Sequence, residues 1–212
     1  MNKNYPILAR EGWPFITLAI MFFVISIYFI NPVISGLSGM ICLFVIQFFR
    51  DPQRKIVAKP NEVVSAADGR VIAIEKTNDP YNKREAIKIS VFMNVFNVHS
   101  NKVPISGKVI NKIYKPGKFL NAALDKASSE NEHCAITIKT SNNQIVTSVQ
   151  IAGLIARRIL CYANEGSDLE KGDRYGFIRF GSRVDHYIPI NSEVKVKLGQ
   201  KVKNTEDILA EI

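Results

Sequence analysis

Apolar residues form one long uncharged stretch near the start of the chain. Residues 14–49 contain no Asp, Glu, Lys or Arg, and Asn31-Pro32 interrupts them. Because proline breaks helical hydrogen bonding, the stretch divides into two runs, Trp13–Ile30 and Val33–Phe49. As a helix each run would span about 26 Å, slightly less than the roughly 30 Å hydrocarbon core of a bilayer. We therefore expect a membrane-anchoring helical hairpin in residues 1–50, which either crosses the bilayer or dips into it. The alternative, a buried hairpin of a soluble protein, would need protein on all sides of two uniformly apolar helices.

From residue 51 onward, apolar and polar positions alternate with the period of a β-strand. Turn-forming residues separate the alternating runs, and the segment Phe119–Glu132 reads instead as a short helix or ordered loop. Many strands at this spacing are typical of an antiparallel sandwich or barrel. The pattern thus predicts a mainly β soluble domain over residues 51–212. The strands are expected at residues 70–75, 86–92, 108–114, 133–139, 144–151, 157–162, 177–180, 183–188 and 193–198.

Charge places this domain on the cytoplasmic side of a membrane. The formal net charge is +9, and most of the excess follows residue 50. Lys3 and Arg10 precede the apolar stretch, and Arg50, Arg54 and Lys55 follow it. Since basic flanks stay in the cytoplasm, we expect the chain in the cell (inner) membrane with its soluble domain inside. An anionic bilayer suits the basic excess, whereas no nucleic-acid-binding motif accompanies it. The three cysteines form neither a metal-ligand spacing nor an even disulfide set.

Few residues carry a chemical signal by pattern alone. His99 ends an apolar strand, Asp68 belongs to an Asp-Gly pair, and Gly181-Ser182 lies between two strand-like runs. Ordinary structural roles remain open for all of them, because Asp-Gly and Gly-Ser pairs are common in turns. A serine after a constrained glycine can also attack the preceding carbonyl carbon, which gives an ester by an N-to-O acyl shift.

The chain resembles proenzymes of the phosphatidylserine decarboxylase family of the short bacterial type. The resemblance covers essentially the whole chain in the family's order. It is carried by Phe48–Pro52, Val64–Val71, Phe96–Pro104, Pro116–Asn121, Glu130–Glu132, Ile151–Ile159 and Gly176–Val184.

Three positions depart from the family's usual pattern. Arg183 follows Ser182 where a threonine is commonest, and Lys102 occupies the place of a second histidine. Asn97 stands where longer members carry an aspartate, which makes Asp68 the candidate orienting carboxylate. His99 would then act alone or recruit Lys102.

The resemblance implies a pyruvoyl-dependent decarboxylase domain, residues 51–212, that cuts itself between Gly181 and Ser182. Ser182 would become a covalent pyruvoyl group, which forms a Schiff base with phosphatidylserine and releases CO2 and phosphatidylethanolamine. His99 would move protons and Asp68 would fix its tautomer, with no metal involved. The implied partners are phosphatidylserine, the membrane, and the second self-cleavage fragment in a heterodimer; nucleic acid is not among them. Whether the chain also forms a homo-oligomer is left open.

Two other classes of function remain open at this point. The chain could be a membrane-anchored lipid-binding β-domain without catalysis, in which the Gly-Ser pair is inert. It could also be a membrane-anchored serine hydrolase that uses Ser182 and His99, although it lacks a nucleophile elbow. Only self-cleavage yields two fragments, the smaller one blocked and carbonyl-reactive.

Overall fold

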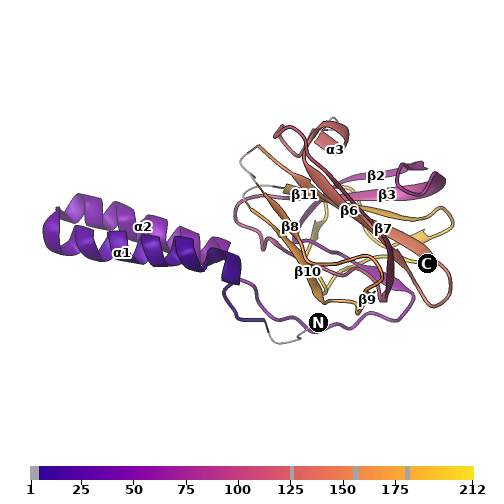
Figure 1. Cartoon of the computed structure of the whole chain (residues 1–212), viewed down its shortest axis with the longest axis horizontal. Helices are drawn as coiled ribbons and strands as arrows, with labels where there is room; N and C mark the ends of the chain where they lie inside the picture. The colour runs from indigo at the N-terminus through magenta and orange to yellow at the C-terminus, as the bar shows by residue number, and fades with distance from the viewer. Residues whose placement is uncertain (1–4, 125–126, 155–157, 180–181) are drawn as a thin grey trace. The chain divides into compact units, whose positions relative to one another are not determined.

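The computed structural model describes residues 5–124, 127–154, 158–179 and 182–212. The chain divides into two compact units (Figure 1). The first unit ends at Gln53, and the second comprises Arg54–Ile212.

The N-terminal unit is a pair of apolar helices. A short 3-10 turn, η1 (Arg10–Gly12), leads into α1 (Trp13–Phe29), and α2 (Pro32–Phe48) follows. Asn31 caps α2, because its side chain accepts a hydrogen bond of 2.9 Å from the backbone N–H of Ile34. Both helices begin and end within one or two residues of the predicted boundaries.

The surface of this helix pair is apolar nearly all round. Buried Ser26 and Ser38 join the helices through a 2.7 Å hydrogen bond between their hydroxyls. Many large apolar side chains on both helices are exposed. By length and composition Arg10–Phe29 could cross a membrane, whereas the apolar helix Pro32–Phe48 is shorter.

The second unit, which we call the β unit, is built almost entirely from antiparallel strands, as predicted. Its elements are β1 (Glu62–Val64), β2 (Gly69–Asp79), β3 (Arg84–Met93), β4 (Ser100–Lys102), β5 (Gly107–Lys115), α3 (Ala127–Glu130), β6 (His133–Lys139), β7 (Ile145–Ala152), β8 (Ile159–Cys161), β9 (Asp168–Leu169), β10 (Arg174–Ile178), β11 (Ser182–Pro189), β12 (Glu193–Val194), β13 (Lys201–Val202) and β14 (Ile208–Glu211).

Eight strands form one large sheet in the order β13-β2-β3-β11-β7-β6-β5-β9. Two three-stranded sheets, β1-β14-β12 and β4-β10-β8, complete the unit. Figure 1 shows β11, β3 and β2 beside β6 and β7, with α3 over one side.

Both faces of the large sheet are covered, and alternation along β11 separates them. Val184 and Ile188 belong to the main apolar core, together with buried residues of the small sheets. Tyr187 belongs to a second cluster on the other face, where Ala127 of α3 also packs. We call these the core face and the α3 face. Ser182 shares the core face with Val184, since side chains two residues apart lie on the same side of a strand.

The differences from the predicted strands have physical causes. Strands of two to four residues, such as β1, β4, β9, β13 and β14, are too short to show an alternating pattern. Only Glu193–Val194 of the run 193–198 forms a strand, whereas β10 begins before its predicted start, at Arg174. Within Phe119–Glu132, only Ala127–Glu130 is helical in the described part of the segment.

Burial keeps His186 neutral on the core face. Its Nε2 accepts a 3.0 Å hydrogen bond from the Ala66 N–H, and its Nδ1 lies 3.3 Å from the Ile89 carbonyl. Desolvation lowers the pKa of His186 to about 4, although the Ile89 bond and Asp185 oppose the shift.

This shift predicts a loss of stability in acid. Below its ordinary pKa the unfolded chain protonates His186, whereas the folded chain does not until pH 4 is approached. The free energy of unfolding should therefore fall by about 2 kcal/mol from pH 7 to pH 5 through this group alone. Urea unfolding of the full chain in detergent micelles tests this, because His186→Gln should lack that part of the loss. Equal acid losses in both chains would contradict the assignment.

Candidate active site

Ser182 lies at one end of the large sheet. It is the first residue of β11 and is completely buried, and it pairs with Met93 at the end of β3 and Ala152 at the end of β7. Its hydroxyl donates to the Met93 sulfur at 3.2 Å. Thioether sulfur is a weak acceptor, so this bond holds the hydroxyl only loosely. Gly181, the other half of the predicted cleavage pair, lies outside the described residues.

His99 lies in the connection that leaves the same end of the sheet. A tight turn begins it: the Asn97 side chain accepts from the Asn94 N–H at 2.9 Å, and Asn94 accepts from the Phe96 N–H at 2.9 Å. His99 is fully buried, with its Nδ1 2.9 Å from the Asn97 carbonyl. A carbonyl can only accept, so Nδ1 carries the proton and the neutral ring keeps its lone pair on Nε2. That tautomer can take a proton from a hydroxyl.

Asp68 is buried in an ion pair with Arg54. Both its oxygens bind the guanidinium, with Oδ2 2.9 Å from Arg54 Nη2, and Oδ1 also accepts from the Asn204 N–H at 2.8 Å. The Asn204 side chain in turn donates to the Ser100 carbonyl at 3.1 Å. Asp68 is thereby linked, through Asn204, to the residue that follows His99. The tautomer-fixing contact that the structure gives to His99 comes from Asn97.

A buried amide pair lies on the core face beside Met93. Gln150 of β7 donates to the Asn101 side-chain oxygen at 2.8 Å, and the Asn101 amide nitrogen lies 4.0 Å from the Met93 sulfur. Gln150 Oε1 is buried and has no hydrogen-bond partner within the described part of the chain. Buried polar atoms are almost always bonded, so this oxygen is suited to accept from a bound polar group. Sequence reasoning missed both amides.

The Arg183 side chain points to the α3 face, away from Ser182. Arg183 and Asp185 form a bidentate ion pair, with Nε–Oδ1 2.6 Å and Nη2–Oδ2 2.8 Å, and both side chains are 1% exposed. Arg183 also binds the Ser128 hydroxyl and donates to the Leu124 carbonyl at 3.3 Å. Arg183, which stands where threonine is commonest in the family, therefore binds the β5–β6 connection to the start of β11.

This ion pair predicts a large stability effect for one substitution. Arg183→Met should lower the free energy of unfolding by roughly 3 kcal/mol, because it leaves the Asp185 carboxylate buried without a counter-charge. The double variant Arg183→Met/Asp185→Leu should recover most of that loss. Urea unfolding in detergent micelles measures both. An Arg183→Met chain as stable as the parent would contradict the buried pair.

The sequence offers three basic residues that could hold the substrate carboxylate, namely Lys102, Arg157 and Arg158. Lys102 ends β4, is buried, and donates its backbone N–H to the Ala66 carbonyl at 2.9 Å. Arg158 is exposed, and Arg157 lies outside the described residues. Among the residues that are described, no group of three or more His, Cys, Asp or Glu could hold a metal ion.

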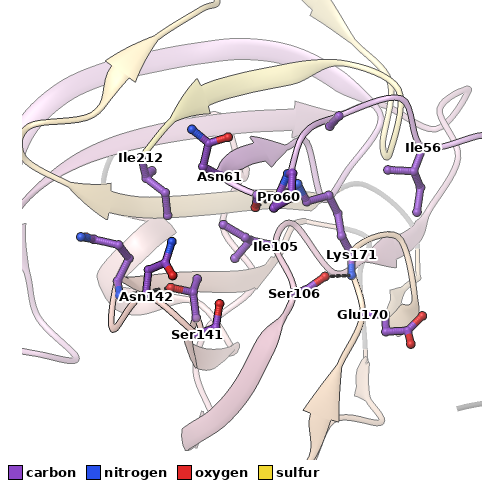
Figure 2. A pocket seen from close by; sticks show the side chains of 13 residues that line it. Ile56, Pro60, Asn61, Ile105, Ser106, Ser141, Asn142, Glu170, Lys171 and Ile212 are labelled. Atoms are coloured by element: carbon purple, nitrogen blue, oxygen red, sulfur yellow. Dashed lines mark hydrogen bonds between the residues drawn. The ribbon is translucent and has the colours of Figure 1, made fainter.

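A separate hollow of about 690 Å³ lies beside the turn at 140–144 (Figure 2). Lys171 lines it, and its ammonium donates to the Glu62 carbonyl at 2.5 Å and to the Lys59 carbonyl. Burial lowers the pKa of Lys171, and Glu62 partly opposes this. Because the ammonium holds backbone carbonyls just before β1 and at its first residue, its role is structural. The turn at 140–144 joins the ends of β6 and β7 that lie away from Ser182.

The chain is similar to known proteins along its whole length. The family model described as phosphatidylserine decarboxylase matches residues 41–210. The chain is 55% identical over 212 residues to the phosphatidylserine decarboxylase proenzyme of Paraburkholderia xenovorans (strain LB400), covering all of both chains. It is also 55% identical over 220 residues to the proenzyme of Burkholderia multivorans (strain ATCC 17616 / 249), covering 100% of this chain and 99% of the relative. From the family match and this full-length identity it follows that the chain belongs to the phosphatidylserine decarboxylase family and is a decarboxylase, a carboxy-lyase.

Proposed function

We propose that this protein converts phosphatidylserine to phosphatidylethanolamine and CO2, using a pyruvoyl group made from Ser182. The observation that carries the proposal is the setting of Ser182. It is a fully buried serine at the start of a strand, with its hydroxyl on a weak sulfur acceptor, in a chain of this family.

The residues around Ser182 fit a pyruvoyl group there. Because Ser182 begins β11, a cut before it interrupts no strand. The new chain end stays paired with Met93 on one side and Ala152 on the other. The Arg183–Asp185 ion pair fastens the next residues from the α3 face. A small uncharged group in this buried position needs no counter-ion.

Self-cleavage needs a nucleophile and a base. The Ser182 Oγ attacks the Gly181 carbonyl carbon, and His99 Nε2 takes the hydroxyl proton. The peptide nitrogen takes this proton from His99 and leaves, so residue 182 carries a free amine and an ester to Gly181. Loss of the α-proton expels the Gly181 carboxylate and leaves a dehydroalanine. Its imine tautomer takes up water and releases ammonia, which leaves the pyruvoyl end.

The same residues serve decarboxylation. The pyruvoyl ketone would supply the carbonyl chemistry that holds the substrate amine and takes up the electron pair when CO2 departs. His99 returns a proton to the carbon that lost CO2, a general-acid step worth roughly 10²–10⁴ in rate. Gln150 Oε1 accepts a hydrogen bond from the bound headgroup, and Asn101 holds that amide in place. Burial of Ser182 and His99 excludes bulk water from the reacting atoms.

Asp68 acts in this proposal as a positioning residue for His99, through Asn204 and Ser100. Asp68→Asn removes the charge that holds Arg54 and should slow self-cleavage by roughly tenfold, because the His99 segment loses its fixed position. Cleavage is followed on denaturing gels at a temperature where the chain stays folded. Asp79→Asn is the matched control, since it also breaks an ion pair of a buried carboxylate, with Arg84, but at the opposite end of the sheet. Equal cleavage rates in Asp68→Asn and the parent would remove Asp68 from the site.

The helix pair is proposed to anchor the enzyme in the membrane that holds its substrate. Its exposed apolar side chains and the basic residues on both sides support insertion, with the β unit in the cytoplasm. A lipid with two acyl chains stays in the bilayer, so an anchored enzyme meets it at high local concentration.

Carboxyl-labelled phosphatidylserine in detergent micelles tests the proposed reaction. The purified full chain should release labelled CO2 and form phosphatidylethanolamine in equal amounts, and prior treatment with a hydrazine should stop both. Binding without CO2 release would favour a lipid-binding domain instead. Release of fatty acid or free serine would favour a hydrolase.

A further inference from the structure

The two ends of the large sheet differ in the side chains that their connections expose. Strand pairing brings Arg70, Met93, Ser182, Ala152 and His133 to one end, which we call the Ser182 end. The connections at the opposite end are the turns 80–83, 140–144 and 190–192, and none of them exposes a large apolar side chain.

Among the described residues, the connections at the Ser182 end expose four large apolar side chains, of which Phe119 at 38% is the least exposed. Phe96 follows β3 and is 64% exposed, Leu124 precedes β6 and is 52% exposed, and Leu154 follows β7 and is 68% exposed. They come from three separate connections that leave neighbouring strands at the same end. Scattered exposed apolar residues are ordinary, and Val57 and Leu198 elsewhere in this unit are examples. A group restricted to one end of a sheet points to a partner.

Cations lie beside Phe96, one member of this apolar group. A hollow of about 610 Å³ lies beside Phe96, and exposed Arg70, Lys201 and Lys203 line it. Asp68 also lines this hollow, and Arg54 neutralises its carboxylate. Lys203 pairs with Glu206 at 3.3 Å, and Arg70 donates to the Gly199 carbonyl at 2.7 Å. The lining therefore carries an excess of positive charge that suits a phosphate.

We propose that the Ser182 end is a second membrane-contact surface, which docks on an anionic phospholipid bilayer independently of the helix pair. Phe96, Leu124 and Leu154 enter the interface between headgroups and acyl chains, and the cationic hollow takes a lipid phosphate. Exposed apolar side chains with Lys and Arg beside them are the combination that binds such interfaces. This goes beyond the proposed reaction, because it assigns a lipid-binding surface to the β unit itself.

Tryptophan probes test this docking in the full chain. The sequence contains one tryptophan, Trp13, so Trp13→Phe gives a silent background. Into it Phe96→Trp or Leu154→Trp is introduced, with Asn142→Trp in the exposed turn at the opposite end as the matched control. Each chain is reconstituted into phosphatidylglycerol vesicles with brominated acyl chains. The probes at 96 and 154 should be quenched at least twofold more than the probe at 142. Two probes from separate connections keep the test valid if one variant does not fold.

A second set of variants tests whether docking requires the positive charges. Replacing Arg70, Lys201 and Lys203 together with glutamine should weaken docking by roughly fivefold for each cation that contacts lipid. Quenching should then fall to the level seen in phosphatidylcholine vesicles.

Three results would overturn the proposal. The first is equal quenching of all three probes. The second is that, in the absence of lipid, the tryptophans at 96 and 154 become more shielded from solvent as the protein concentration rises. This would indicate that a second copy of the chain covers them. The third is quenching that changes neither with the charge of the lipid nor when Arg70, Lys201 and Lys203 are replaced with glutamine. The vesicles contain no phosphatidylserine, so none of these results depends on decarboxylation. A chain whose tryptophan fluorescence is quenched as expected, but which does not decarboxylate phosphatidylserine, would contradict only the proposed reaction.

Discussion

Ser182→Ala should remain one uncut chain of 23.8 kDa with no decarboxylase activity. Cleavage before residue 182 needs an oxygen that can carry the ester, and a methyl group cannot. Loss of one buried hydroxyl that donates to the weak Met93 sulfur acceptor should leave the fold intact. Denaturing gels and CO2 release measure the two effects. The expected loss of activity is complete, because no pyruvoyl group can form.

Ser182→Cys is the matched control for this substitution. Its thiol can form a thioester, so slow cleavage is expected where Ser182→Ala shows none. Circular dichroism of both variants should match that of the uncut parent. An Ser182→Ala chain that still separates into two fragments would place the cut elsewhere or assign it to another nucleophile.

His99→Ala should slow both self-cleavage and turnover, each by roughly 10²–10⁴. The reason is that His99 takes the Ser182 proton in the first process and returns a proton in the second. The two rates are separable when turnover is normalised to the amount of cleaved chain. His99→Gln should not restore either rate, because an amide does not exchange protons near neutral pH.

His133 provides the matched control for His99. It is also buried, and its Nδ1 lies 2.8 Å from the Asn131 carbonyl, the same local contact that His99 makes with Asn97. Its ring, however, packs beside Tyr81, which joins the cluster on the α3 face. His133→Gln should therefore keep both rates close to those of the parent. Parent-like rates in His99→Ala would remove His99 from the mechanism.

The long elements of the fold could be predicted because each carries its own local signal. Asn31-Pro32 marks the boundary between the helices, since proline starts a helix and the asparagine side chain caps it. Strands such as β2, β3, β6 and β7 are long enough for alternation to show. The short strands lack such a signal and exist because distant segments pair with them.

The site was predictable only in part. Ser182 and His99 followed from the family resemblance, not from pattern, and the cleavage they are expected to perform stays a prediction. Arg54 and Asn204 were missed because their contact joins residues 150 apart in the chain. Gln150 was missed because one polar residue on an apolar strand gives no hint of an unbonded buried oxygen. The residues two positions before and after Gln150 are buried, so Gln150 lies on a buried face of its strand. That placement points to the site only once the structure shows that this is the face of Ser182.

Mass measurement of the purified wild-type chain under denaturing conditions tests the central claim most directly. The account predicts two fragments, residues 1–181 and residues 182–212. The smaller should resist N-terminal sequencing, react with a hydrazine, and become reducible by borohydride when an amine is present. A preparation that decarboxylates phosphatidylserine while the bond between residues 181 and 182 is intact would contradict the account.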